Sequence, residues 1–182
     1  SFANIFSIKK FKTIIIGCDL RNPQLHKLLN LNKDLKGLSN FIFEDDVDYK
    51  KYLHRPEGTN LDVMLSGVIP PDPTIYFESE KFSKLITDLK NDYDYIFLDS
   101  APSMIISDTL VYSKLTDSTI YMTRSNHTDI ELVEFINKCD KEGILPNIKI
   151  INNGTGVQKL YGYNYKYNYS YSYNYGYGYT YN

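Results

Sequence analysis

The sequence has no tryptophan, only two cysteines and no long apolar run. Cys18 and Cys139 lie far apart in the chain, so they suggest neither a metal-binding cluster nor a disulfide framework, and a reducing compartment is expected. No stretch approaches the ~18 apolar residues of a membrane-spanning helix, and the start of the chain has no signal-peptide pattern. The formal net charge of −2 leaves no electrostatic footprint for nucleic acid, so we expect no nucleic-acid partner.

What is present is a regular alternation of apolar runs and helical patterns. With 182 residues, the chain is long enough for one domain with its own core. The alternation predicts an α/β fold, in which a parallel sheet is covered by helices on both faces. Because the first residue is Ser1 rather than Met, we expect a fragment or a processed product. The expected strands are 13–17, 61–65, 95–99, 118–122 and 148–151; the expected helices are 1–10, 24–29, 37–43, 74–90, one starting at Asp108, and one that Gly143 ends.

Polar residues set three local expectations. The charged segment 44–55 is predicted to be a solvated surface segment. Residues 128–131, Thr-Asp-Ile-Glu, have the pattern of a capping box at the start of a helix. Asp108 is interpreted either as a helix N-cap or as a functional carboxylate, and the sequence leaves both open.

Two of the expected strands end in an aspartate that a Pro-containing turn follows. Asp19 comes directly after the apolar run 14–18, and Asp99 ends the run that begins at Tyr95. In an open parallel sheet, ligands bind outside the carboxyl ends of the strands. Carboxylates on two adjacent strand ends would form half of a Mg-nucleotide site. A strand-terminal aspartate is also a common turn or N-cap residue, so spacing alone does not decide between these interpretations.

The motifs around both aspartates resemble those of the bacterial tyrosine kinases, which are P-loop autokinases of capsule and exopolysaccharide assembly. Residues 16–23, Ile-Gly-Cys-Asp-Leu-Arg-Asn-Pro, resemble the family's Walker A′ motif, and residues 96–102, Ile-Phe-Leu-Asp-Ser-Ala-Pro, resemble its Walker B motif. Further similar blocks follow the family's order: 37–40, 65–73, 107–108 and the tyrosine-rich C-terminus. The resemblance implies a P-loop NTPase-like kinase domain in residues 1–160 and an autophosphorylation tail in residues 161–182.

The resemblance also implies a set of functional residues. Asp19 and Asp99 would be catalytic and would lie in the Mg²⁺ shell, Arg21 would lie near the phosphates of ATP or at a subunit contact, and Asn153 would contact the adenine. The γ-phosphoryl group would pass to tail tyrosines. The family implies a ring-like homo-oligomer, a membrane polysaccharide co-polymerase segment fused upstream or separate, a cognate tyrosine phosphatase, and control of polysaccharide chain length and export. The expected location is the cytoplasmic face of the bacterial inner membrane.

Two departures from the family pattern stand out. The phosphate loop Gly-x-x-x-x-Gly-Lys-Ser/Thr does not occur in the sequence. We therefore expect the first strand of the family's sheet to be absent as well, and this fragment alone to be inactive. The residue two positions before Asp19 is commonly Asp in the family and is Gly17 here. We expect an Asp at position 17 to keep or raise activity.

Tyrosine occupies every second position of the C-terminal segment 161–182, with Gly, Asn, Ser, Thr and one Lys between. Such alternation is compatible with cross-β stacking, with a low-complexity disordered end, and with a row of phosphate acceptors. The resemblance to the kinases favours acceptors on a disordered tail. The predicted acceptors are Tyr161, Tyr163, Tyr165, Tyr167, Tyr169, Tyr171, Tyr173, Tyr175, Tyr177, Tyr179 and Tyr181.

Two other functions remain open at this point. The chain would be a non-catalytic protein that presents a phosphorylatable tail, or a partitioning ATPase of the ParA/MinD type. The tyrosine-rich tail argues against the second, because such ATPases usually end in a helix that binds a membrane or a partner.

Overall fold

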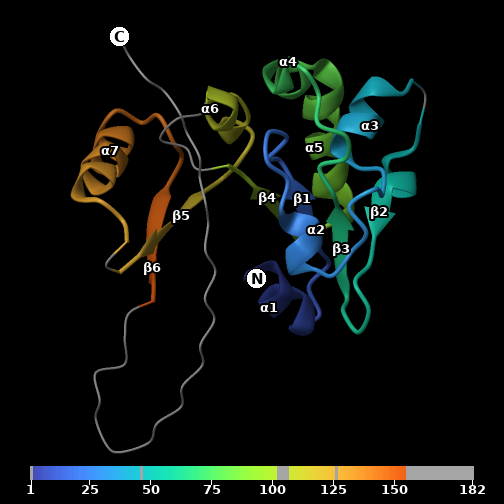
Figure 1. The fold of residues 1–182 in the computed structure, drawn as a ribbon, viewed down its shortest axis with the longest axis horizontal. Coiled ribbons are helices and arrows are strands. Elements are labelled where there is room, and N and C mark those ends of the chain that lie inside the picture. The colour runs from blue at the N-terminus through green and yellow to red at the C-terminus, as the bar shows by residue number, and fades with distance from the viewer. Residues whose placement is uncertain (1, 46, 102–106, 126, 155–182) are drawn as a thin grey trace, which may run out of the picture.

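The computed structural model describes residues 2–45, 47–101, 107–125 and 127–154. The tyrosine-rich segment 161–182, with every prediction made for it, lies outside these residues. The described strands form a four-stranded sheet of order β2-β3-β1-β4 and a two-stranded sheet of β5 and β6, which Figure 1 shows on opposite sides of the molecule. The strands are β1 (Thr13–Gly17), β2 (Leu53–His54), β3 (Leu61–Met64), β4 (Tyr95–Asp99), β5 (Thr119–Arg124) and β6 (Ile148–Asn153).

The larger sheet is built around β1, which pairs in parallel with β3 on one side and with β4 on the other. Thr13 lies opposite Leu61 and Tyr95, and Gly17 lies opposite Asp99. All five β1 residues are buried, as expected for a β-branched strand flanked on both sides. The predicted parallel sheet is therefore confirmed for β1, β3 and β4, and β2 adds a short antiparallel edge to β3.

Helices cover both faces of this sheet, as predicted. Side chains alternate along β1, so Ile14 and Ile16 belong to one apolar cluster and Ile15 belongs to another. The first cluster also includes the predicted apolar face of α5 (Glu80–Asp92). The second includes Ala3 of α1 (Phe2–Ile8) and Leu25 of α2 (Leu25–Leu28). The helices are α1 (Phe2–Ile8), α2 (Leu25–Leu28), α3 (Leu38–Phe43), α4 (Pro73–Glu78), α5 (Glu80–Asp92), α6 (Ser107–Ser113) and α7 (Ile130–Lys141), with a 3₁₀ turn, η1 (Tyr49–Tyr52).

The single helix predicted for 74–90 is wrong, because Ser79 divides it into α4 and α5. The backbone of Ser79 is extended, and its Oγ accepts a hydrogen bond from the Phe82 N–H at 3.1 Å. Ser79 is thus the N-cap of α5. The helical spacing of apolar residues continues across the break, so periodicity alone did not reveal it.

The segment 44–55 is also not the solvated segment that its charge suggested. Tyr49 and Tyr52 of η1 are buried, and both belong to the first apolar cluster. The Tyr52 hydroxyl donates to Glu44 Oε2 at 2.8 Å, so a buried aromatic ring keeps its polar end satisfied. The charged neighbours of the tyrosines concealed this contribution to the core.

The predicted capping box at 128–131 is not formed. Asp129 is the N-cap of α7 but makes no side-chain capping bond, and the Thr128 Oγ1 accepts from the Arg124 N–H at 2.7 Å instead. Thr128 therefore closes the turn after β5 rather than the start of α7. At the other end of α7, Gly143 has a φ of 64° and ends the helix as predicted.

The described residues form six strands rather than the five predicted, because β2 was not anticipated. Among the described strands, β4 pairs only with β1 and β5 only with β6, so each keeps one edge without a strand partner. On β5, the apolar residues Ile120 and Met122 are 42% and 50% exposed. In the described ranges no helix is long and apolar enough to cross a membrane.

Candidate functional site

The site lies where the carboxyl ends of β1 and β4 meet. The backbone carbonyl of Asp99 accepts hydrogen bonds from the N–H groups of Cys18 and Asp19, at 2.8 and 3.1 Å. The chain leaving β1 is thereby tied to the last residue of β4. The two aspartates that the sequence singled out are brought together at one edge of the sheet, which is where ligands bind in open parallel sheets.

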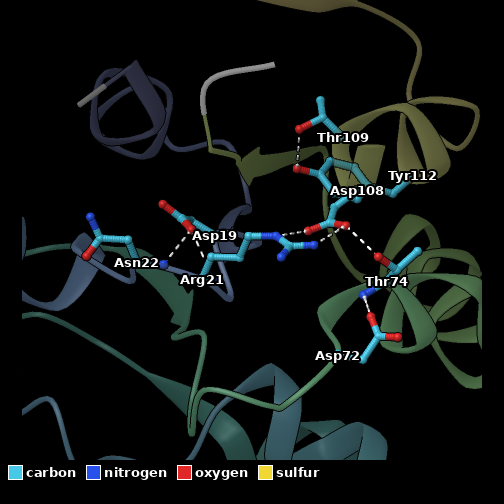
Figure 2. A network of polar contacts seen from close by, with 8 residues as sticks. All are labelled: Asp19, Arg21, Asn22, Asp72, Thr74, Asp108, Thr109 and Tyr112. Atoms are coloured by element: carbon cyan, nitrogen blue, oxygen red, sulfur yellow. Dashed lines mark hydrogen bonds and ion pairs between the residues drawn. The ribbon is translucent and has the colours of Figure 1, made fainter. Parts of the chain in front are cut away.

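The loop after β1 is organised around the Asp19 carboxylate. Its Oδ1 accepts from the backbone N–H groups of Arg21, at 3.2 Å, and Asn22, at 2.8 Å (Figure 2). This arrangement closes a tight turn by side-chain-to-backbone bonding. No hydrogen bond within the described residues reaches the second oxygen, Oδ2, so one oxygen shapes the loop and the other remains for a ligand.

Burial and like charge set the electrostatics of this edge. The pKa of Asp99 is raised, first by burial and then by the negative charge of Asp19. The pKa of the Cys18 thiol is raised well above its ordinary value by burial and by both carboxylates, so Cys18 is a neutral packing residue. A carboxylate whose pKa is raised by burial and by a second negative charge marks a site suited to a cation.

Arg21 is held by a carboxylate from a distant part of the chain. Its Nε donates to Asp108 Oδ2 at 2.8 Å and its Nη2 donates to Asp108 Oδ1 at 3.1 Å. The Thr74 hydroxyl also donates to Asp108 Oδ1, at 2.8 Å, and the Thr74 N–H donates to Asp72, the N-cap of α4. Figure 2 shows that this network joins the loop after β1 to the first turns of α4 and α6. The hydrogen bond to Asp108 raises the pKa of Arg21, which stays charged.

Asp108 is the residue of this network that the sequence resolved least well. The interpretation as an N-cap is wrong, because Asp108 is the second residue of α6 and its side chain is 6% exposed. The sequence marked this residue only through the Ser-Asp block at 107–108, which resembles a family motif. That block does not indicate Arg21 as the partner of Asp108. Only the fold brings Asp108 to Arg21, 87 residues earlier in the chain.

Gly17 is packed too tightly to accept the aspartate that the family pattern carries at that position. A Cβ atom at Gly17 would lie 2.6 Å from Ser66 Oγ and 2.9 Å from the Ser66 backbone nitrogen. An Asp at position 17 would therefore require the loop after β3 to shift, and the expectation that it keeps or raises activity stays a prediction.

Asn153 lies on the second sheet, as the last residue of β6 and opposite Arg124 of β5. It is exposed, and its Oδ1 accepts from the Gly154 N–H at 2.8 Å. The neighbouring Asn152 is instead bonded to Ser125 of the turn after β5. The described contacts do not link Asn153 to Asp19 or Asp99, so its predicted role remains a prediction.

The donor set at the β1–β4 edge is small. The described residues contain no group of three or more His, Cys, Asp or Glu side chains that could hold a metal ion. Mg²⁺ is typically held by one or two protein carboxylates, with the phosphates of its substrate and water completing the shell. Asp19 and Asp99 fit that pattern and do not fit a closed site made of protein ligands alone.

Comparison with curated proteins gives a consistent family. No protein-family model matches the chain. Over 110 residues, 60% of this chain and 47% of the relative, it is 32% identical to the "Putative tyrosine-protein kinase CapB" of Staphylococcus aureus. Over 168 residues, 90% of this chain and 23% of the relative, it is 28% identical to the tyrosine-protein kinase wzc of Salmonella typhimurium. The chain thus spans about half the length of CapB.

Solved structures agree with this result. The chain is 27% identical to the VpsO kinase domain, with a TM-score of 0.75 over 85% of this chain and 75% of that one. A ParA family ATPase from Chlorobium tepidum has a TM-score of 0.64 over 82% of this chain and 65% of that one, at 18% identity. The second likeness concerns the fold alone, which is that of P-loop NTPases.

Proposed function

We propose that this chain, which belongs to the bacterial tyrosine kinase family, is the C-terminal part of a protein-tyrosine autokinase domain that transfers the γ-phosphoryl group of ATP to its own tyrosines. The observation that carries the proposal is the meeting of Asp19 and Asp99 at the carboxyl ends of two paired parallel strands. Phosphoryl transfer depends on positioning the reactants and on neutralising charge more than on covalent catalysis. Two carboxylates at this edge could hold the metal ion that does both.

Asp19 and Asp99 are the residues that would hold Mg²⁺. One oxygen of Asp19 accepts hydrogen bonds within its own loop and the other does not, while Asp99 is half-buried and has a raised pKa. When bound, the metal ion supplies charge neutralisation for the phosphates of ATP. The hydrogen bonds from the Cys18 and Asp19 N–H groups to the Asp99 carbonyl hold the backbones of the two aspartates together.

Arg21 and Asn153 complete the proposed nucleotide contacts. Arg21 supplies a permanent positive charge at the edge that Asp19 and Asp99 make negative. Asn153 ends β6 and presents an exposed amide, the kind of group that recognises a base edge. Asp19 and Arg21 lie in one loop, whereas Asn153 comes from the second sheet.

The proposed acceptors are the tyrosines at alternate positions of segment 161–182. Glycine and asparagine between them leave the backbone unhindered, which a protein-tyrosine active site requires of its substrate. Fully extended, the 22 residues reach ~70–80 Å, enough to enter the site of a neighbouring subunit. We therefore place transfer between the subunits of a ring-like homo-oligomer.

The proposed setting is the cytoplasmic face of a bacterial inner membrane, where polysaccharide chain length and export are controlled. A membrane co-polymerase segment, on the same polypeptide or on a partner, would hold the kinase there. A tyrosine phosphatase would reverse the modification. The identities with CapB and wzc support this setting through the family, because the bacterial tyrosine kinases act in capsule and exopolysaccharide assembly.

The decisive experiment replaces Asp99 by Asn in the full-length protein. We expect Asp99→Asn to fold and to lose Mg·ATP-dependent phosphotyrosine on the order of 100-fold or more, because a Mg²⁺-shell charge is removed while the shape is kept. The readout is the intact mass after incubation with Mg·ATP. Asp45→Asn is the matched control, because Asp45 is an exposed carboxylate in the segment that follows α3.

The same assay separates the two other functions. A non-catalytic acceptor would gain no phosphate alone but would gain it when an active kinase of the family is added. A partitioning ATPase would release phosphate from ATP without any change in protein mass. Wild-type phosphorylation by Asp99→Asn would remove Asp99 from the site.

A further inference from the structure

Two segments far apart in the sequence meet at the Asp108 carboxylate, which itself belongs to a third. It accepts hydrogen bonds from Nε and Nη2 of Arg21, in the loop after β1, and from the hydroxyl of Thr74, in the first turn of α4 (Figure 2). Asp108 itself lies in the first turn of α6. One side chain therefore connects the loop that carries Asp19 to two helices that pack against each other.

The two members of the ion pair are unequally exposed, and this decides which one acts on a ligand. The Arg21 side chain is 46% exposed, whereas that of Asp108 is 6% exposed. A buried carboxylate needs a paired and hydrogen-bonded partner, so Asp108 cannot itself turn toward solvent without losing three donors. Arg21 is the member that reaches the open edge of the sheet.

The geometry of the pair leaves one edge of the guanidinium for another anion. A guanidinium has five N–H donors in a planar fork, and Asp108 takes the side formed by Nε and Nη2. No hydrogen bond in the described part of the chain uses Nη1. The edge formed by Nη1 and Nη2 has the spacing that suits two oxygens of a phosphate.

We propose that Asp108 is the positioning residue that aims this second edge of Arg21 at the polyphosphate bound beside Asp19 and Asp99, and that Thr74 in turn holds Asp108. The inference rests on the proposed function, because it concerns the same nucleotide. Thr74 follows the Pro-rich loop directly, so the network makes the start of α4 part of the support for the nucleotide site. Neither Asp108 nor Thr74 contacts the reacting atoms.

The test measures the dissociation constant of Mg·ATP in the full-length protein by calorimetry. Asp108→Asn keeps the shape of the side chain but removes the charge that holds Arg21, and we expect binding to weaken about tenfold. Thr74→Val, which removes the hydroxyl, should weaken it less, and Thr74→Ser, which keeps the hydroxyl, should stay near wild type. In the double variant, Thr74→Val should add little to Asp108→Asn, because both act through one chain of contacts.

A matched control is another arginine–aspartate pair of the described residues, in which both arginine donors bind one carboxylate oxygen. Arg55 donates through Nε and Nη2 to Asp62, which lies near the amino end of β3, at the opposite end of the sheet from Asp19. Asp62→Asn removes the same kind of ion pair, and we expect it to lower thermal stability without a change in Mg·ATP binding. A merely structural Asp108 would behave like Asp62.

A second readout reports the pair without any nucleotide. In spectra of ¹⁵N-arginine-labelled protein, the Nε–H signal of Arg21, assigned with Arg21→Lys, should exchange slowly with water in the wild type and rapidly in Asp108→Asn. Unchanged exchange of the Arg21 Nε–H in Asp108→Asn would overturn the network. Additive effects of Asp108→Asn and Thr74→Val on Mg·ATP binding would also overturn it. Unchanged Mg·ATP binding in a folded Asp108→Asn protein would overturn the positioning role. A wild type that binds Mg·ATP but phosphorylates nothing would instead overturn the proposed function and leave the binding test of Asp108 in force.

Discussion

Ser66 occupies the space in which a side chain at Gly17 would lie, with its Oγ and its backbone nitrogen both within 3 Å of the Cβ position. The loop after β3 therefore closes over the end of β1, and the absence of a side chain at residue 17 is part of how this edge of the sheet is packed. Glycine is thus needed at position 17 because of the contact with Ser66. Its backbone angles do not require glycine, because φ at Gly17 is not positive.

The first prediction concerns this contact. Gly17→Asp should lower the free energy of unfolding by about 1–3 kcal/mol, because the Cβ and the carboxylate must displace Ser66. Urea denaturation of the full-length protein measures the loss. Gly17→Ala should show a smaller loss of the same kind, and Ser66→Ala in the Gly17→Ala background should recover part of it. Wild-type stability of Gly17→Asp would show that the β3 loop yields easily.

The second prediction concerns pH and Asp99. Its folded-state pKa is raised, so the protonated carboxyl favours folding below the ordinary pKa of about 3.9 and this contribution is lost as pH rises through the raised value. At neutral pH the ionised form of Asp99 lowers the free energy of unfolding. Asp99→Asn, which resembles the protonated form, should raise the melting temperature at pH 7 in the absence of Mg²⁺.

The difference between wild type and Asp99→Asn should shrink as the pH falls toward the ordinary carboxyl range. Melting curves over a pH series check this, with Asp45→Asn as the exposed control. Since Mg²⁺ with ATP is expected to bind only the wild type well, their addition should reverse the order of the two melting temperatures. A destabilised Asp99→Asn protein at pH 7 would mean that the charge of Asp99 is already compensated.

The third prediction concerns Tyr52. The side chain is fully buried, so Tyr52→Ala should cost about 3–5 kcal/mol of stability, whereas Tyr52→Phe keeps the ring and should cost far less. Burial and the bond to Glu44 raise the pKa of Tyr52 to about 12. Stability that is present below pH 10 should therefore fall as pH rises toward 12, and Tyr52→Phe should remove this part of the alkaline loss. Urea denaturation at neutral and alkaline pH tests both statements.

The fourth prediction concerns the tail. Each phosphotyrosine adds about −1.5 to −2 charge at pH 7, and Lys166 is the only positive side chain between residues 161 and 182. Multiple phosphorylation should make neighbouring tails repel one another and loosen the oligomer, the more so at low salt. Light scattering of phosphorylated and dephosphorylated full-length protein compares the masses. Equal masses at low and high salt would contradict the repulsion.

Short-range features of the chain were predictable because they depend on local patterns. A run of β-branched residues that ends at Gly17 predicted a buried strand, and the apolar spacing between Phe82 and Leu89 predicted the buried face of α5. The positions of Asp19 and Asp99 at the ends of parallel strands also followed from the sequence, since apolar runs and turn residues mark strand ends. The pairing of β1 with β4 then placed both carboxylates at one edge, as expected.

Contacts between distant segments were decided by the tertiary structure. The charge around Tyr52 concealed its burial, because a local pattern does not show that Glu44 satisfies the hydroxyl. The helical period ran through Ser79, because a capping bond competes with the helix without changing the apolar spacing. Asp108 looked like a helix cap, because nothing near it in the sequence names Arg21 or Thr74 as its partner. The sequence alone determined which strands carry the carboxylates. The packing of α4 and α6 beside the loop after β1 determined how Arg21 is held.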